Sequence, residues 1–476
     1  MATIDKTREL ETKGIGSLLL EYALPAVVSQ VVTSVYNIVD RVFLGHSADG
    51  NGTLYLAALA ITFPVMNIIH AFGSLVGAGA SSRMSIVLGR KDVRWAEKIL
   101  GNTMLLTFFF GFLFVTAGYI WMRPILTLFG ASQQTLDFAC QYMDIVLPGM
   151  FLVTMTYNLT GLIRASGYPS KAMWIMIGGA ILNIFLDYLF IGVLCMGVAG
   201  AAWGTTISMA LTALVSVVHF VQPHSFIRFK AHAWAPKLYI FRNILAIGIS
   251  PFSMNVAAFA VVAVLNRQLA AYGGDNAVAV YGVVNSAAGL ILMTFLGVCQ
   301  GMQPIAGYNY GAGRNDRLRK VYVLTLQVCV ALGIVGSALS MLFPASIIKC
   351  FNSEESIVTV GVPALRYLMV FAPFIAYTIT NSQLFQAIDQ PWIAIVTSLS
   401  RQVIFLIPIS LILPGIIHRA GGDGVTGVWL SCMICDLLGA ALSTVLLVTH
   451  RQVFRLGYVA PERKPRKELG PKEKDK

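Results

Sequence analysis

The sequence predicts an all-α integral membrane protein, with twelve membrane-spanning helices arranged as two pseudo-symmetric six-helix bundles. Three observations predict this fold class. The 476 residues are 57% hydrophobic and only 12% charged, against roughly 25% charged residues in ordinary globular proteins. The apolar residues fall into twelve long stretches. Several short motifs of the first half return in the same order in the second half.

A helix needs about 20 apolar residues to cross the hydrocarbon core of a bilayer. The stretches are continuously apolar rather than alternating, so helices are expected and not a β-barrel. The first stretch is much longer than the apolar core of a secretory signal and should be retained. The expected spans are 14–44, 54–84, 99–120, 136–162, 170–194, 198–221, 246–271, 277–305, 321–344, 361–387, 392–415 and 425–449.

The basic residues predict the orientation, because cytoplasmic segments of membrane proteins are enriched in Lys and Arg. Most of the 34 Lys and Arg residues lie in the N-terminal tail, the even-numbered connections and the C-terminal tail. The opposite side carries only Arg123, Arg267, Lys349 and Arg419. We therefore expect a multi-pass protein of the bacterial inner (plasma) membrane with both termini in the cytoplasm. The basic tail should face anionic lipid and not nucleic acid.

Internal repetition predicts two halves with the same orientation. Pro25 matches Pro251, and Gly89-Arg90-Lys91-Asp92 matches Gly313-Arg314-Asn315-Asp316 at an offset of 224 residues. Parallel repeats are related by an axis along the membrane normal, and a substrate cavity lies between them. The predicted parts are a cytoplasmic tail (1–13), a first lobe (14–221), a cytoplasmic connection (222–245), a second lobe (246–450) and a basic cytoplasmic tail (451–476).

Acidic residues inside the spans are candidates for ion coupling, because a charge at membrane depth is costly. Asp40 and Asp187 both lie well inside spans of the first half, and Asn183 precedes Asp187 by one helical turn. A carboxylate beside a carbonyl oxygen can hold Na⁺, and a buried carboxyl group can instead hold a proton. A structural ion pair of Asp40 with Arg41 is the alternative. Three further candidates in the same bundle are Tyr36, Asn37 and Thr205.

The second half is poor in acids, and Asp436 in the last span is the exception. It can act in coupling or substrate binding, or it can pair across helices with Arg401. Other polar side chains at membrane depth can line the cavity, although hydrogen bonding between helices is their commoner use. These are Asn285, Gln300, Gln303 and, in the first half, His70.

The chain lacks the motifs of several enzyme classes. It has no G-x-x-x-x-G-K-[ST] loop for phosphates and no H-E-x-x-H metal pair. We therefore expect neither an enzyme nor a bound cofactor. Transport would be driven by an ion gradient or be passive.

The sequence resembles the multidrug and toxic compound extrusion (MATE) family of the MOP superfamily, from about Gly14 to His450. The residues that carry the resemblance are Pro25, Gln30, Tyr36-Asn37-Ile38-Val39-Asp40, Gly77-Ala78-Gly79, Gly89-Arg90-Lys91-Asp92, Arg164-Ala165-Ser166-Gly167, Asn183, Asp187 and Gly197-Val198-Ala199-Gly200-Ala201-Ala202.

This resemblance implies a V-shaped pair of six-helix lobes that exports cationic or amphipathic drugs in exchange for Na⁺ or H⁺. We expect the protein to be a monomer. The resemblance also implies a cation site in the first lobe at Asp40, Asn183, Asp187 and Thr205. A second-lobe site known in one branch needs acids in the seventh and tenth spans, which are absent here. The chain therefore looks closer to the DinF-like and MepA-like branch, where an acid like Asp436 also occurs.

Two other functions remain open at this point. A flippase for lipid-linked oligosaccharides or lipids would use basic residues in the cavity to hold pyrophosphate. Only four arginines lie at membrane depth, namely Arg41, Arg83, Arg366 and Arg401. A membrane scaffold or receptor without transport is the third possibility, and the buried acids argue against it.

Overall fold

The computed structural model describes residues 7–45, 52–223, 225–351 and 354–454, and within them every side chain except that of Asn37. The predicted all-α fold is confirmed, since the described residues form helices and no β-strand. The predicted N-terminal tail contains a short helix, α1 (Thr7–Thr12). Of the basic tail at 451–476, only the single turn η4 (Arg451–Phe454) lies in the described part.

The first lobe, here called the N-lobe, contains six spans. The fifth span changes from α-helix to π-helix directly after Asp187, so that α6 and η1 together form one span. The helices of the N-lobe are α2 (Ile15–Gly45), α3 (Gly52–Gly89), α4 (Val93–Leu128), α5 (Gln133–Ala165), α6 (Pro169–Asp187), η1 (Tyr188–Val193) and α7 (Gly197–Val221).

The second lobe, the C-lobe, contains the other six spans. Its first helix has 74 residues and would be about 110 Å long if straight. It is broken at Gly274, which has a φ of 67°, and therefore forms two spans. The helices of the C-lobe are α8 (Leu238–Gly311), α9 (Asn315–Leu342), α10 (Pro344–Lys349), α11 (Glu355–Met369), α12 (Ala372–Ala387), α13 (Pro391–Leu399), η3 (Ser400–Leu406), α14 (Ile407–Arg419) and α15 (Gly424–Thr449).

The predicted number of twelve spans agrees with these helices. Ten helices are long and apolar enough to cross a membrane, with α8 counted once. The pair α11 and α12 adds one span that is bent by 46°, and the break at Gly274 divides α8 into two.

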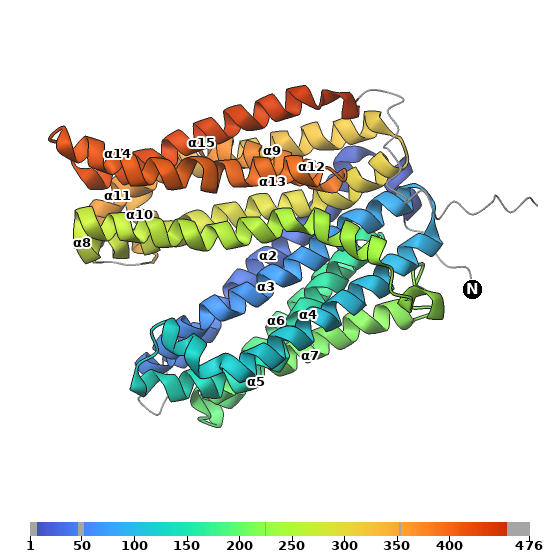
Figure 1. Cartoon of the computed structure of the whole chain (residues 1–476), viewed down its shortest axis with the longest axis horizontal. Coiled ribbons are helices and arrows are strands. Elements are labelled where there is room, and N and C mark those ends of the chain that lie inside the picture. Colours follow the sequence, from blue (N-terminus) through green and yellow to red (C-terminus); the bar gives the residue numbers. More distant parts are fainter. Residues whose placement is uncertain (1–6, 46–51, 224, 352–353, 455–476) are drawn as a thin grey trace, which may run out of the picture.

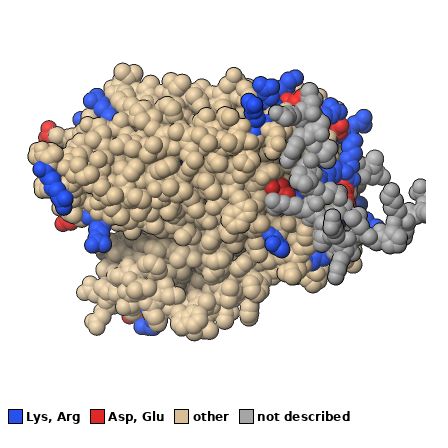
Figure 2. All heavy atoms as spheres, turned by 45° about the horizontal axis from the view of Figure 1, so that its top comes forward, with Lys and Arg blue, Asp and Glu red and all other residues tan. Residues whose placement is uncertain are grey.

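The two lobes form a V (Figure 1). They meet at the end where the described N-terminus lies and diverge at the other end. Lys and Arg gather at the end where the lobes meet, and the surface is hollowed between the lobes at the other end (Figure 2). The broad middle of the surface in this view is almost free of charge.

Glycines allow the helices of the two lobes to touch where they meet. A Cβ on Gly89 of α3 would collide with the carbonyl of Tyr308, and a Cβ on Gly311 of α8 would collide with the carbonyl of Ile86. These two contacts are related by an offset of 222 residues. The offset of 224 inferred from the motifs at this turn is therefore wrong by two residues. The helices α3 and α8 end at Gly89 and Gly311, and each turn then places its second residue, Lys91 or Gly313, at positive φ.

The connection between the lobes packs against α4. The Asn102 side chain donates to the carbonyl of Ala235 at 3.1 Å and accepts from the backbone N–H of Lys237 at 2.9 Å. The buried Glu97 carboxylate lies 2.8 Å from Lys230 Nζ and 3.0 Å from His232 Nε2. Helix α8 begins at Leu238, inside the range predicted for the connection.

Candidate ion-coupling site

Three of the four residues predicted for the cation site are buried in the N-lobe. Asp40 lies on α2 with 9% of its surface exposed, while Asn183 and Asp187 lie on α6 and are 1% and 0% exposed. Asn183 and Asp187 are four residues apart, so both face the same side of α6. Asp187 ends α6 and is followed by the π-helix η1, and π-helical turns occur frequently at functional sites.

The buried polar atoms of these residues lack protein partners. Both carboxylate oxygens of Asp187, the side-chain O and N of Asn183, and Oδ1 of Asp40 have no hydrogen-bond partner among the described residues. An uncompensated buried charge costs several kcal/mol. The carboxylates of Asp40 and Asp187 are therefore well suited to bind a cation or a proton, which would neutralise their charge.

The two acids are close enough to interact electrostatically with each other and with Tyr142. Tyr142 lies on α5, in the neighbourhood of Tyr36 of α2. Helix α7 completes the site, because a Cβ at Gly204 would lie 2.5 Å from Oδ1 of Asp187. Four helices of one lobe therefore converge on two carboxylates.

The remaining predicted members lie beside this group. Thr205 follows Gly204 on α7, and its side chain is partly exposed. The side chain of Asn37 lies outside the described residues, so its role stays a prediction. The alternative ion pair is not formed in the described part of the chain. Instead, the Arg41 guanidinium lies 5.5 Å from the ring centre of Phe63.

The acid of the C-lobe is paired. Arg401 Nε lies 2.5 Å from Oδ1 of Asp436, and Asp436 is 1% exposed. Arg401 lies in the π-helix η3, and its Cβ would lie 3.2 Å from a Cβ built on Gly439 of α15. Of the two roles predicted for Asp436, the structure shows the ion pair with Arg401 across helices.

The other polar candidates are dispersed. Gln303 of α8 donates to Ser82 Oγ of α3 at 2.6 Å and thus connects the two lobes. His70 packs edge-on against Tyr157, with ring centres 5.4 Å apart. Gln300 is partly exposed and Asn285 is exposed.

Tyr142 and Gly204 were not among the residues predicted for the site. Tyr142 lies in the first half of α5 and is one of 17 tyrosines, and Gly204 is one of 43 glycines. Helical periodicity does not place Gly204 on the same face as the candidate Thr205, because adjacent residues of an α-helix point in directions about 100° apart. The convergence of α5 on Asp187 depends on tertiary packing that periodicity does not contain.

Comparisons with known proteins agree with this architecture. The MatE family model matches residues 25–189 and 246–412, which lie in the N-lobe and the C-lobe. The multidrug export protein MepA of Staphylococcus haemolyticus is 24% identical over 441 residues, with 93% of this chain and 95% of that protein covered. MepA of Staphylococcus aureus is 24% identical over 438 residues, with 92% and 94% covered.

Solved structures show the same fold. A MOP superfamily transporter from Pyrococcus furiosus, described as having a binding pocket of reverse polarity, superposes with a TM-score of 0.88 at 23% identity and covers 96% of this chain and 100% of its own. A multidrug resistance MATE family transporter in an outward-facing conformation gives a TM-score of 0.86 at 23% identity, with 95% and 99% covered.

The family predicted from the sequence motifs is thus confirmed. The matched family model spans most of the chain and includes both halves of the repeat. The chain belongs to the MatE family of membrane transporters.

Proposed function

We propose that this protein is a secondary active multidrug exporter, which exchanges cationic or amphipathic compounds for H⁺ or Na⁺. The observation that carries this proposal is the pair of buried acids Asp40 and Asp187, whose oxygens include three without a hydrogen-bond partner in the described part of the chain. The relatives named multidrug export proteins support the choice of substrate class. The protein would act as a monomer.

The charge distribution supports the orientation. Lys and Arg gather at the end where the lobes meet (Figure 2), and basic segments favour the cytoplasmic side. Both termini would then lie in the cytoplasm of a bacterial cell, and the V would open to the outside. A drug would leave from the space between the lobes in this state.

Coupling follows from differential affinity. A cation shifts the equilibrium between two conformations only if it binds one of them more tightly. Binding at Asp40 and Asp187 would neutralise two adjacent buried carboxylates and change the packing of α2, α6 and α7 around Gly204. Because α2 also packs against α8 of the C-lobe at Gly297 and Gly301, such a change would reach the interface between the lobes.

The test is dye efflux from proteoliposomes under an imposed pH gradient or an imposed Na⁺ gradient. Asp40→Asn should reduce gradient-driven efflux by about 100-fold, because interactions with a charged group contribute up to about 3 kcal/mol. Asp144→Asn is the matched control, since Asp144 is an exposed acid of the same lobe. Wild-type efflux by a well-inserted Asp40→Asn protein would contradict the proposed coupling.

A flippase of the MOP superfamily remains the alternative. Against it, two of the four arginines at membrane depth already have acidic partners. Arg83 Nη1 lies 3.0 Å from Asp389, and Arg401 pairs with Asp436. A cell-envelope defect on deletion, without a change in drug resistance, would favour the flippase.

A further inference from the structure

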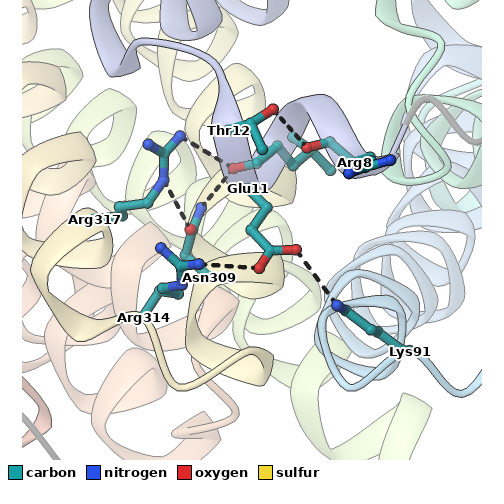
Figure 3. Close-up of polar contacts among 8 residues, drawn as sticks. Arg8, Glu11, Thr12, Lys91, Asn309, Arg314 and Arg317 are labelled. Carbon is teal, nitrogen blue, oxygen red and sulfur yellow. Dashed lines mark hydrogen bonds and ion pairs between the residues drawn. The ribbon is translucent and has the colours of Figure 1, made fainter.

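The short helix α1 lies across the junction of the two lobes (Figure 3). It is covalently joined to α2 of the N-lobe, yet its backbone is bound by the C-lobe. Leu10 of α1 is fully buried in a core cluster that contains residues of both lobes. A segment with this placement is constrained by both lobes at once.

Two side chains of the C-lobe bind the carbonyl groups at the end of α1. Arg317 Nη2 donates to the carbonyl of Lys13 at 2.6 Å and to that of Leu10 at 3.2 Å. Asn309 Nδ2 donates to the same Leu10 carbonyl at 3.3 Å, and its Oδ1 accepts from Arg317 Nε at 3.2 Å. A guanidinium at the C-terminal end of a helix satisfies carbonyls that have no partner within the helix.

One carboxylate of α1 bridges the lobes. Glu11 Oε1 lies 3.1 Å from Arg314 Nη2 of the C-lobe, and Oε2 lies 3.7 Å from Lys91 Nζ of the N-lobe. Lys91 follows α3 and Arg314 precedes α9, so the two cations come from the turns that the repeat relates to each other. The Glu11 side chain is 20% exposed, and it separates two like charges that would otherwise repel each other.

We propose that α1 is a clasp that stabilises the closed junction between the lobes, and that Glu11 must leave Lys91 or Arg314 when this end of the protein opens. The segment that follows α1 allows such a movement. Gly14 separates α1 from α2, and a Cβ at Gly14 would meet no atom within 4 Å. The clasp depends on the relative position of the two lobes and requires no particular substrate or coupling ion.

The experiment measures the distance between the lobes at this end by pulsed electron spin resonance on the full chain in detergent. Spin labels are attached to Arg94→Cys on α4 and Lys320→Cys on α9, both exposed positions. Among the described cysteines, Cys195 and Cys350 are exposed and are changed to Ser, while the other five are buried. No gradient or drug is needed, so the result is independent of the proposed export activity.

Glu11→Gln should increase the population with the larger inter-lobe distance by roughly two- to fivefold, since partly exposed ion pairs contribute modestly. Glu9→Gln is the matched control, because Glu9 lies on the same helix and pairs only with Lys13, at 3.8 Å, among the described residues. The triple variant Glu11→Lys, Lys91→Glu, Arg314→Glu should restore the wild-type distances.

Two results would overturn the clasp. One is an unchanged distance distribution in Glu11→Gln. The other is an equal shift in Glu9→Gln and Glu11→Gln, which would show that the net charge of the N-terminal segment matters and the bridge does not. If the first result is accompanied by a fall in the thermal stability of Glu11→Gln, Glu11 has a purely structural role.

Discussion

The two lobes have related folds, but their buried acids differ in whether they have a charged partner. In the N-lobe, Asp187 has two buried oxygens without a hydrogen-bond partner in the described part of the chain. In the C-lobe, Oδ1 of Asp436 lies 2.5 Å from Arg401 Nε, and only its Oδ2 lacks a partner there. A pair of opposite charges needs no ion, whereas two adjacent carboxylates bind one favourably. The difference favours ion coupling in the N-lobe and a structural pair in the C-lobe.

The largest effect is expected when the pair in the C-lobe is broken. Arg401→Gln leaves the Asp436 charge buried and unpaired, which should destabilise the protein by about 3–5 kcal/mol. The double variant Arg401→Met, Asp436→Leu removes both charges and should recover most of that loss. Thermal unfolding of the purified protein in detergent measures both.

Arg366→Gln is the control for this prediction. Arg366 is an exposed arginine of the same lobe, and its guanidinium donates to the carbonyl of Met341 at 3.3 Å. Its loss should change stability by less than about 1 kcal/mol. A stable double variant that has lost gradient-driven transport would show that the C-lobe pair takes part in coupling.

The corresponding substitution in the N-lobe should impair transport without lowering stability. Asp187→Asn replaces an uncompensated buried charge by a neutral group, so the stability should stay the same or increase. Gradient-driven efflux should fall by about 100-fold, as for Asp40→Asn. Thermal unfolding and efflux measured on the same preparation test both parts, and a loss of stability with preserved efflux would contradict the comparison.

A smaller effect is expected from Gly204→Ala. The new methyl group would lie 2.5 Å from Oδ1 of Asp187, so either the carboxylate or α7 must move. We expect the driving cation to bind roughly tenfold more weakly, which corresponds to a loss of about 1.4 kcal/mol in binding free energy. Gly178→Ala on α6 is the matched control, because a Cβ there meets no atom within 4 Å. Equal effects of the two substitutions would show that helix propensity is responsible.

Much of the fold could be predicted from the sequence, because each span is a long and predominantly apolar stretch and basic connections separate several of the spans. The bend between α11 and α12 was not predicted, although Pro373, the second residue of α12, marks it in the sequence. The π-helices η1 and η3 could not be predicted. They depend on how helices pack, and no Gly or Pro lies at the change from α6 to η1. The repeat could be recognised from the sequence, but its offset at the turn after Gly89 could not. The similar tetrapeptides at 89–92 and 313–316 occupy different positions of two equivalent turns.

The site was predicted less completely. Asp40, Asn183 and Asp187 stand out as polar residues within apolar spans, whereas Tyr142 and Gly204 belong to residue types that are common in this chain, which has 17 tyrosines and 43 glycines. The partner of Asp436 was among the predicted alternatives, because Arg401 and Asp436 are rare charges in adjacent spans. The clasp residue Glu11 carries no such signal, since an acid in a hydrophilic N-terminal segment is ordinary.

The smallest effect concerns Thr205, which the resemblance places in the site and the structure leaves partly exposed beside Gly204. Thr205→Val keeps the shape of the side chain and removes its hydroxyl group, which contributes about 1 kcal/mol, or about fivefold in affinity, when it binds a ligand. Na⁺ needs several oxygen ligands, whereas a proton needs only a carboxylate. We therefore expect Thr205→Val to weaken Na⁺-driven efflux by up to about fivefold and to leave H⁺-driven efflux unchanged. Thr205→Ser, which retains the hydroxyl group, is the control, and equal losses under both gradients would remove Thr205 from the cation site.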